Sequence, residues 1–160
     1  MKLIFRKAKE KDLDELSRLL EALFFIETDF VVDPEKQKTG LALFFSSSEE
    51  KAIFVAENEG VLVGMVTGQL VISTAAGGYS ILVEDLYVQD RFRHKDIGTS
   101  LVQMVQKWGK GKGALRIQLL ADRRNKAAHI FYRTLGFQAS RMYGLYMPLG
   151  GFTDEKRGQE

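Results

Sequence analysis

The second half of the chain alternates between strand-like and helix-like patterns, and this alternation restricts the fold more than any other feature of the sequence. Residues 81–88 have the apolar pattern of a strand, and residues 114–121 repeat it. Between them, apolar residues recur at helical spacing: Ile97, Leu101, Met104, Val105 and Trp108. Residues 125–135 predict another helix, and residues 137–149 predict one or two closing strands. This order indicates an α/β layered sheet in which 81–88 and 114–121 run parallel, because right-handed β-α-β crossovers dominate.

The first half supplies further strands and two helices. Leucines and phenylalanines recur at helical spacing over residues 13–24, and Asp33-Pro34 opens a second helix that reaches residue 45. Strands are expected at three places: residues 3–6, 52–57 and 61–72, with a hairpin turn at 58–60 and a loop at 73–79. We expect a single domain over residues 1–149 and a loose polar tail at 150–160.

Composition excludes several classes of protein. The 160 residues contain no cysteine, which rules out a disulfide scaffold, a cysteine-ligated metal and a thiol nucleophile. Two histidines without cysteine do not predict a metal site. The net charge of +2 is too small to predict a dedicated nucleic-acid or membrane binder, and no apolar run is long enough for a signal peptide or a membrane span. We expect a soluble cytoplasmic protein.

A basic loop within residues 86–99 joins the end of a strand to the start of a helix. The N–H groups at a helix start have no partners within the helix and carry the positive end of its dipole, so a phosphate is a natural occupant. Cationic side chains lie beside this point: Arg91, Arg93, His94 and Lys95. A solvated loop that only caps an ordinary helix is the alternative. A nucleic-acid surface built from residues 91–95 and 123–126 is a further one, which the net charge does not favour.

Two motifs, in this order, resemble those of the GNAT superfamily of N-acetyltransferases. Residues 83–88 and 93–98, followed by Leu101, are similar to motif A, Gln/Arg-x-x-Gly-x-Gly/Ala, which binds acyl-CoA. Residues 125–137 are similar to motif B, Asn-x-x-Ala-x-x-Phe-Tyr-x-x-x-Gly-Phe. The likeness extends over residues 3–149. It implies the GNAT fold: a mixed, mostly antiparallel sheet of six or seven strands flanked by about four helices. The parallel pair at 81–88 and 114–121 is then splayed, with a bulge in the first of these strands.

The resemblance also implies a site for acetyl-CoA as co-substrate, with no metal. The backbone N–H groups expected to hold its pyrophosphate belong to Arg93, His94, Lys95, Asp96, Ile97, Gly98 and Thr99. The pantetheine arm would pair as an added strand with Leu86, Tyr87 and Val88 and lie near Asn125, Ala128 and Tyr132. Asp96 departs from the motif, since it stands where the first glycine belongs. Aspartate tolerates left-handed backbone conformations, but its carboxylate repels a pyrophosphate unless Arg93 or Lys95 compensates.

Acetyl transfer to an amine needs a base and a proton donor for the departing thiolate. Tyr132 is the candidate donor because a phenol stays protonated at neutral pH and the family places this tyrosine near the thioester sulfur. Glu84 is the first candidate for the base and Asp85 the second, since acids inside an apolar strand need a partner or a site. The alternatives are a core role for Tyr132 and an exposed or ion-paired role for the two acids. Three more acids lie in the region that usually forms the acceptor wall in this family: Glu21, Glu27 and Asp29. The resemblance therefore implies that they attract a cationic amine, and a solvated helix end is an equal alternative.

The leading hypothesis is therefore an N-acetyltransferase that moves an acetyl group from acetyl-CoA to a primary amine by direct attack. The acceptor is expected to be a small molecule such as a polyamine, an aminoglycoside or an amino-acid derivative, with a protein amine as an alternative. A catalytically weak CoA-binding sensor or structural domain is a second reading, which Asp96 supports. No nucleic acid or membrane is expected as a partner. A homodimer is possible through the closing segment at 137–149, which contains Tyr143 and Tyr146.

Overall fold

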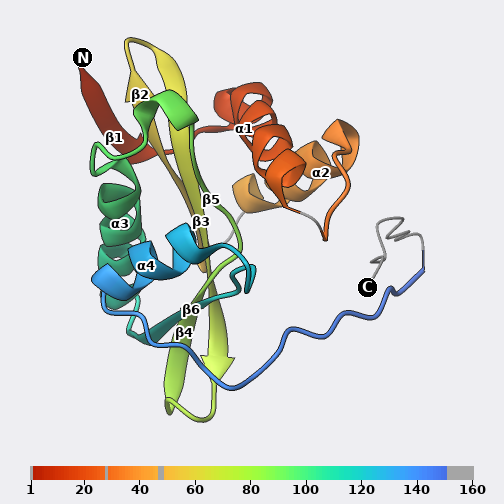
Figure 1. The fold of residues 1–160 in the computed structure, drawn as a ribbon, viewed down its shortest axis with the longest axis vertical. Coiled ribbons are helices and arrows are strands. Elements are labelled where there is room, and N and C mark those ends of the chain that lie inside the picture. The colour runs from red at the N-terminus through yellow and green to blue at the C-terminus, as the bar shows by residue number, and fades with distance from the viewer. Residues whose placement is uncertain (1, 28, 47–48, 151–160) are drawn as a thin grey trace.

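A six-stranded mixed sheet forms the centre of the computed structural model, which describes residues 2–27, 29–46 and 49–150 (Figure 1). Its strands are β1 (Leu3–Lys7), β2 (Lys51–Asn58), β3 (Val61–Ser73), β4 (Gly78–Val83), β5 (Leu86–Val88) and β6 (Ala114–Leu119). They are arranged in the order β1-β2-β3-β4-β6, and β5 pairs with β3. All pairs are antiparallel except β4 and β6, which are parallel. The expected fold, a mostly antiparallel sheet with one parallel pair, is confirmed.

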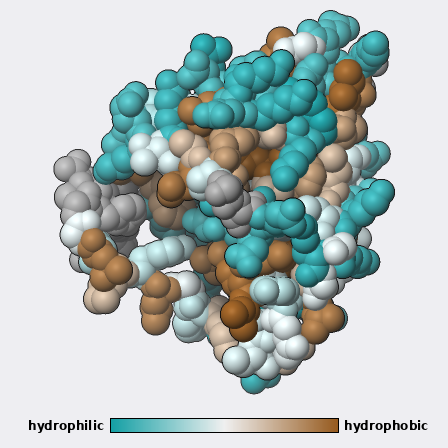
Figure 2. All heavy atoms as spheres, turned by 180° about the vertical axis from the view of Figure 1, so that it is seen from behind, coloured by the Kyte–Doolittle hydropathy of each residue, from teal (hydrophilic) through white to brown (hydrophobic). Residues whose placement is uncertain are grey.

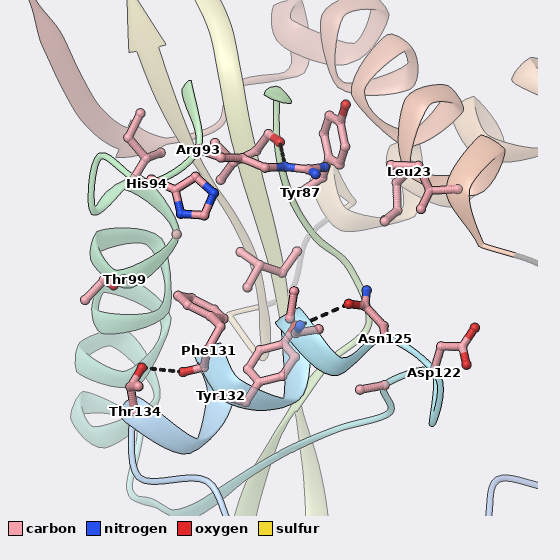
Figure 3. A pocket seen from close by; sticks show the side chains of 18 of the residues that line it. Leu23, Tyr87, Arg93, His94, Thr99, Asp122, Asn125, Phe131, Tyr132 and Thr134 are labelled. Atoms are coloured by element: carbon pink, nitrogen blue, oxygen red, sulfur yellow. Dashed lines mark hydrogen bonds between the residues drawn. The ribbon is translucent and has the colours of Figure 1, made fainter. Parts of the chain in front are cut away.

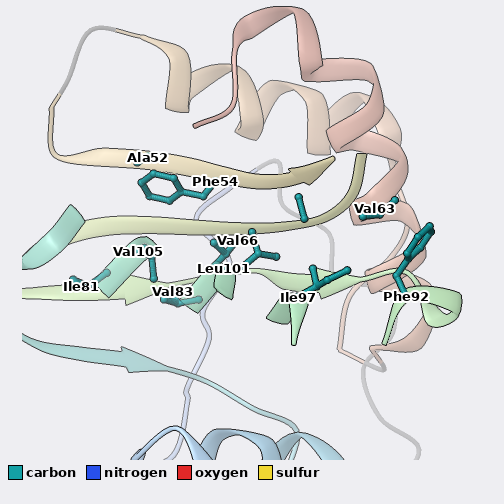
Figure 4. Close-up of a cluster of buried hydrophobic side chains, with 11 residues drawn as sticks. Ala52, Phe54, Val63, Val66, Ile81, Val83, Phe92, Ile97, Leu101 and Val105 are labelled. Atoms are coloured by element: carbon teal, nitrogen blue, oxygen red, sulfur yellow. The ribbon is translucent and has the colours of Figure 1, made fainter. Parts of the chain in front are cut away.

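Four α-helices cover the two faces of the sheet. They are α1 (Leu13–Ile26), α2 (Pro34–Phe45), α3 (Ile97–Gly111) and α4 (Lys126–Thr134), with short 3-10 helices at Glu10–Asp12 and Asp90–Phe92. Strand β2 shows the two layers, because successive strand side chains point to opposite faces. Phe54 packs with Leu101 and Val105 of α3 in one buried cluster (Figure 4), whereas Ile53 and Val55 pack with leucines of α1 in the other.

A partly buried group of ion pairs fixes the start of α1 against the sheet. Arg6 on β1 donates to both carboxylate oxygens of Asp12, at 2.7 and 3.0 Å, and to Glu57 on β2 at 2.8 Å. The Lys9 N–H donates to Asp12 as well, at 2.7 Å. These donors, Arg6 foremost, hold the pKa of Asp12 below its usual range. The network ties the first strand, the first helix and the hairpin together at the edge of the sheet.

Two expected elements differ from the observed ones. The predicted strand at 81–88 is interrupted, because β4 ends at Val83 and β5 starts at Leu86. The closing strands predicted at 137–149 are wrong: the chain there is extended but pairs with no strand of the described residues. The loop expected at 73–79 is shorter in the structure, because β3 ends at Ser73 and β4 starts at Gly78. Residues 151–160 of the expected tail lie outside the described residues.

The helices of the described residues are all too short or too polar to cross a membrane. The longest of them, α3, has 15 residues, fewer than the roughly 20 that a bilayer requires.

Candidate functional site

A β-bulge opens the sheet between β4 and β5. Leu82 pairs with Gln69 and Leu86 pairs with Val66, so four steps along β4–β5 face only three along β3. One extra residue is therefore inserted at this point, as in a β-bulge. Strand β6 follows β4 as far as the pair Val83–Leu119, whereas β5 pairs with β3. The bulge and splay implied by the family resemblance are present, and they leave the edge of β5 that faces β6 without a strand partner among the described residues.

A cavity of about 500 Å³ lies in this opening, between β5, the start of α3, the end of α1 and the helix α4 (Figure 3). Most residues expected to bind the cofactor line it: Leu86, Tyr87, Val88, Arg93, His94, Asp96, Ile97, Gly98, Thr99, Asn125, Ala128 and Tyr132. Lys95, Glu84 and Asp85 do not line it. The structure thus brings segments from both halves of motif A and from motif B to one concave surface.

The N-terminus of α3 points three free backbone donors at this cavity. Ser100 is the first residue whose N–H has a helical acceptor, the carbonyl of Asp96, at 2.9 Å. The N–H groups of Ile97, Gly98 and Thr99 precede it, and the Asp96 side chain makes no capping hydrogen bond to them. Such a helix start favours an anion through its N–H groups and its dipole.

The loop before α3 adopts two left-handed backbone conformations. His94 and Asp96 both have φ of 58°. The position where the motif has glycine therefore requires the conformation that glycine favours, and Asp96 adopts it as expected of aspartate. Two residues later, at Gly98, the reason for a glycine is close packing between helices. A Cβ on Gly98 would lie 3.1 Å from the Phe131 ring of α4, so α4 packs tightly on the start of α3.

The cationic side chains of the loop have partners of their own. Arg93 donates from Nε to the Val88 carbonyl at 3.1 Å (Figure 3). It also forms an ion pair with Asp90 at 2.9 Å. The Lys95 ammonium lies 5.3 Å from the centre of the Phe92 ring. Of the two residues expected to offset Asp96, Arg93 lines the cavity and Lys95 does not. The Val88 carbonyl of β5 therefore already accepts one hydrogen bond, from Arg93.

Tyr132 and Asn125 lie on α4, as the motif B spacing requires. Burial raises the pKa of Tyr132 to about 12, with a further contribution from the charge of Glu27, so the phenol is protonated at neutral pH. Its ring packs 5.3 Å from that of Phe131 and 5.5 Å from that of Phe137. Asn125 caps α4 by accepting a hydrogen bond from the Ala128 N–H at 3.0 Å. The half-buried Tyr132 therefore presents a proton donor to the cavity.

The two acids at the bulge differ from each other. Asp85 is buried, 8 % exposed, and accepts from the Thr67 hydroxyl at 3.2 Å. Burial, with a smaller contribution from the Glu84 carboxylate, raises the pKa of Asp85 to about 7. Glu84 is exposed. Since neither lines the cavity, the structure does not bring the two predicted bases into contact with Tyr132.

Glu27 is the acid that sequence reasoning placed only in a possible acceptor wall. It follows the last turn of α1 and lines the cavity. Burial foremost, together with repulsion from Asp85 and Asp29, raises the pKa of Glu27 to about 7. Neighbouring acids contribute in the same way: Asp122 and Glu84. Its proximity to Tyr132 depends on how α1 and α4 meet across the sheet, which no local sequence pattern reveals.

Among the described residues, no three His, Cys, Asp or Glu side chains form a group able to hold a metal ion.

Comparisons with known proteins identify the family. The model of the acetyltransferase (GNAT) family matches residues 13–137, which is more than half of the chain. The protein therefore belongs to the GNAT acetyltransferase family, and the family resemblance inferred from the two motifs is confirmed. An uncharacterized N-acetyltransferase of Methanocaldococcus jannaschii is 29 % identical over 129 residues. That match covers 78 % of this chain and 57 % of the relative, so the chain spans little more than half of the relative's length.

Solved structures share the fold. A transcriptional regulator from Bacillus halodurans superposes with a TM-score of 0.79 at 24 % identity, over 92 % of this chain and 100 % of the other. The aminoglycoside N-acetyltransferase AAC(6')-Iy, solved with a bisubstrate analogue, has a TM-score of 0.79 at 17 % identity, over 93 % and 99 %. Glucosamine-6-phosphate N-acetyltransferase from Arabidopsis thaliana has a TM-score of 0.74 at 21 % identity, over 92 % and 99 %. At these identities the likeness concerns the fold.

Proposed function

We propose that the protein transfers an acetyl group from acetyl-CoA to a primary amine of a small molecule. One observation carries this proposal: the free N–H groups at the start of α3, the open edge of β5 and the Tyr132 side chain all face one cavity. This arrangement fits a ligand that has a pyrophosphate at one end and an extended, amide-containing arm. AAC(6')-Iy, which has the same fold, was solved in complex with CoA. A cytoplasmic site of action is part of the proposal.

In this proposal, different residues of the cavity bind different parts of acetyl-CoA. Ile97, Gly98 and Thr99 hold the pyrophosphate through their N–H groups, and the backbone of β5 pairs with the pantetheine arm. The thioester supplies the acetyl group, so that a carbon–nitrogen bond forms at the amine while the carbon–sulfur bond breaks. Tyr132 donates its hydroxyl proton to the departing sulfur. The amine loses a proton to a base, and this proton replaces the one that Tyr132 gave up.

We propose Glu27 as that base. An alkyl amine has a pKa near 10.4, so its neutral form at pH 7 costs about 4.6 kcal/mol, and a base within the cavity lowers this barrier. Glu27 lines the cavity, and its pKa of about 7 lets it accept a proton at neutral pH. Asp85 and Glu84, the bases expected from the sequence, keep a supporting role in this proposal: their charges raise the pKa of Glu27 and attract a cationic amine.

Ligand binding is tested by thermal unfolding with and without acetyl-CoA. At about 100 times its dissociation constant the cofactor should stabilise the protein by about 2.7 kcal/mol, which raises Tm by about 5–10 °C. An unchanged Tm at millimolar acetyl-CoA contradicts the proposal. Thiol release on adding a panel of amines (a polyamine, an aminoglycoside, glucosamine 6-phosphate) then identifies the acceptor class.

The acid–base assignment is tested by the pH profile of kcat/KM. The wild-type value should rise through about pH 7, where Glu27 loses its proton. Glu27→Gln should lower it by about 100-fold and remove this limb. Glu21→Gln, a half-buried acid of the same helix outside the cavity, is the matched control and should leave the profile unchanged. If the rise in kcat/KM near pH 7 is retained in Glu27→Gln but lost in Asp85→Asn or Glu84→Gln, the base is one of the two acids at the bulge instead.

The proton donor is tested separately. Tyr132→Phe should lower kcat by about 100-fold while the thermal shift with acetyl-CoA is retained, because only the hydroxyl is lost. Tyr143→Phe, which removes a hydroxyl from an exposed ring, is the control. Full turnover by Tyr132→Phe excludes Tyr132 as the acid.

Asp96 favours one alternative, a CoA-binding domain with little or no catalytic activity, because this acidic residue lines the cavity at the start of α3, where the anion is proposed to bind. That alternative predicts the thermal shift without thiol release for any amine in the panel. Acetylation of a protein amine is distinguished in the same assay by replacing the panel with lysine-containing peptides. A homodimer is proposed as the functional unit.

A further inference from the structure

Helix α4 bears the proposed proton donor, Tyr132, although none of its own residues is buried. The chain that follows the helix, residues 138–149, is extended and pairs with no strand of the described residues. Figure 2 shows hydrophobic side chains of this segment separated from the body of the molecule by open space. The position of Tyr132 therefore depends on the contacts that α4 makes with the other elements around the cavity.

One of these contacts joins the Phe131 ring to the first turn of α3. A Cβ added at Gly98 would lie 3.1 Å from Cζ of Phe131 and 3.5 Å from its Cε2. The shorter distance is tighter than ordinary van der Waals contact, so even a methyl group at residue 98 would push the ring away. Gly98 also carries one of the N–H groups that precede the first helical acceptor of α3. The Phe131 ring therefore packs on the backbone of the anion site itself.

The same ring also contacts Tyr132. The two ring centres are 5.3 Å apart with the planes tilted by 59°, and in Figure 3 the Phe131 ring lies between α3 and the Tyr132 ring. Phe137 contacts Tyr132 as well: its ring centre is 5.5 Å away, and its N–H donates to the Tyr132 carbonyl at 3.0 Å. Aromatic pairs at these separations attract each other. The Tyr132 ring is thus held by two neighbours, of which Phe131 connects it to α3.

We propose that Phe131 is a positioning residue for acetyl transfer, whose ring fixes the distance between the N–H groups of α3 and the Tyr132 hydroxyl. This inference rests on the proposed function, because that distance has to match the span from the pyrophosphate to the sulfur of acetyl-CoA. A displacement of about 1 Å between reacting groups can lower a rate about 100-fold. The Phe131 side chain has no group that transfers a proton, so it acts through Tyr132.

Two complementary substitutions test this spacing. Gly98→Ala adds a methyl group that displaces the ring by a few tenths of an ångström, and Phe131→Leu leaves a gap. Each should lower kcat at saturating acetyl-CoA about 10-fold. Because the shorter leucine makes room for the methyl group, the double variant should have a higher kcat than either single variant, whereas independent effects would multiply to a loss of about 100-fold.

Two controls accompany the kinetic measurement. Gly111→Ala, in the same helix with nothing near its Cβ, is the matched control for the added methyl group and should retain the wild-type kcat. Calorimetric titration should give Phe131→Leu a dissociation constant for CoA within about threefold of wild type, because the N–H groups of α3 are unchanged. The loss is then one of kcat and not of binding.

A second measurement needs no turnover. In protein labelled with fluorotyrosine, the fluorine resonance of Tyr132 is assigned by its loss in Tyr132→Phe, and it reports the surroundings of the ring. Gly98→Ala should shift this resonance, and Gly111→Ala should not. In the Phe131→Leu background, Gly98→Ala should leave the resonance in place, because the ring that transmits the displacement is gone.

The outcomes separate this inference from the proposed function. Losses of kcat that multiply, a wild-type kcat in Phe131→Leu, or a Tyr132 resonance that Gly98→Ala does not shift each overturn the inference and leave the acetyltransferase proposal intact. A wild type that releases no thiol with any amine overturns the proposed function, and the fluorine resonance then decides whether Phe131 connects Tyr132 to α3. If Phe131→Leu lacks the wild-type circular dichroism spectrum, Phe131→Met replaces it in both measurements.

Discussion

The side chain of Asp96 combines a backbone requirement with an electrostatic disadvantage. Its φ of 58° lies in the left-handed region, which costs most residues about 1–2 kcal/mol and glycine almost nothing. Asp96 lines the cavity at the start of α3, and its side chain makes no capping hydrogen bond to the first N–H groups of that helix. The residue therefore preserves the turn that the site needs and opposes the anion that the site is proposed to hold.

Substitutions at Asp96 separate these two effects. Asp96→Asn removes the charge and keeps the side-chain shape, so it should tighten CoA binding by about 3- to 10-fold with Tm unchanged. Asp96→Gly should tighten binding similarly and also stabilise the protein by about 1 kcal/mol, because the strain of the turn disappears. Calorimetric titration with CoA and thermal unfolding measure the two quantities. Glu35→Gln on α2 is the control, and an affinity that Asp96→Asn leaves unchanged refutes electrostatic opposition.

At the scale of elements, the position of α3 depends on small residues facing the sheet. Gly109 is buried, and a Cβ at this position would collide with the Ile81 side chain on β4. Gly68 on β3 makes the same kind of close approach to Val105 of α3. The helix therefore lies close to the sheet along its length, which sets the position of its first turn at the cavity.

Two glycines near the end of α3 provide a matched pair for testing this packing. Gly109→Ala should destabilise the protein by about 1–3 kcal/mol, because Ile81 has to shift to admit the methyl group. Gly111→Ala, in the same helix with nothing near its Cβ, should be neutral or stabilise by up to about 1 kcal/mol. Urea denaturation measures both. Equal stability of the two variants contradicts the close packing of α3 on β4.

For the molecule as a whole, burial of acids at the bulge makes stability depend on pH. Asp85 has its pKa raised to about 7 by burial, above its ordinary value of 3.8. Between these values the folded state binds more protons than the unfolded state, so this group's contribution to stability is lost as pH rises from about 4 to about 7. Glu27 acts in the same direction.

Asp85→Asn should reduce this dependence, because asparagine does not titrate and its amide oxygen can still accept from Thr67. The expected result is a variant more stable than the wild type at pH 8 and with a smaller loss of stability from pH 4 to pH 8. Urea midpoints across this range measure it, with Glu35→Gln as the exposed control. A steeper loss in Asp85→Asn than in the wild type contradicts the assignment.

Much of this architecture could be predicted from the sequence. Helical spacing located α1 and α3 within a few residues, and the two motifs located the loop before α3 and the helix α4. Failures arose where distant contacts decide the outcome. The predicted strand at 81–88 is interrupted because its two parts pair with β3 in registers that differ by one residue. Glu27 lines the cavity because α1 ends beside it. The apolar pattern of 137–149 predicted strands, but within the part of the chain that the structure describes no strand pairs with this segment.

The extra residue between β4 and β5 has a consequence for how such a protein could change. Strand β3 is continuous over 13 residues and pairs with both strands, so the opening is one insertion in an otherwise regular ladder. Deleting one residue at Glu84 or Asp85 would restore the register, let β5 continue in line with β4 and bring it alongside β6. The molecule would keep its two buried hydrophobic clusters and lose the opening between β5 and β6. Deletion of a single codon would therefore keep the fold and remove the cavity on which the proposed acetyl transfer depends.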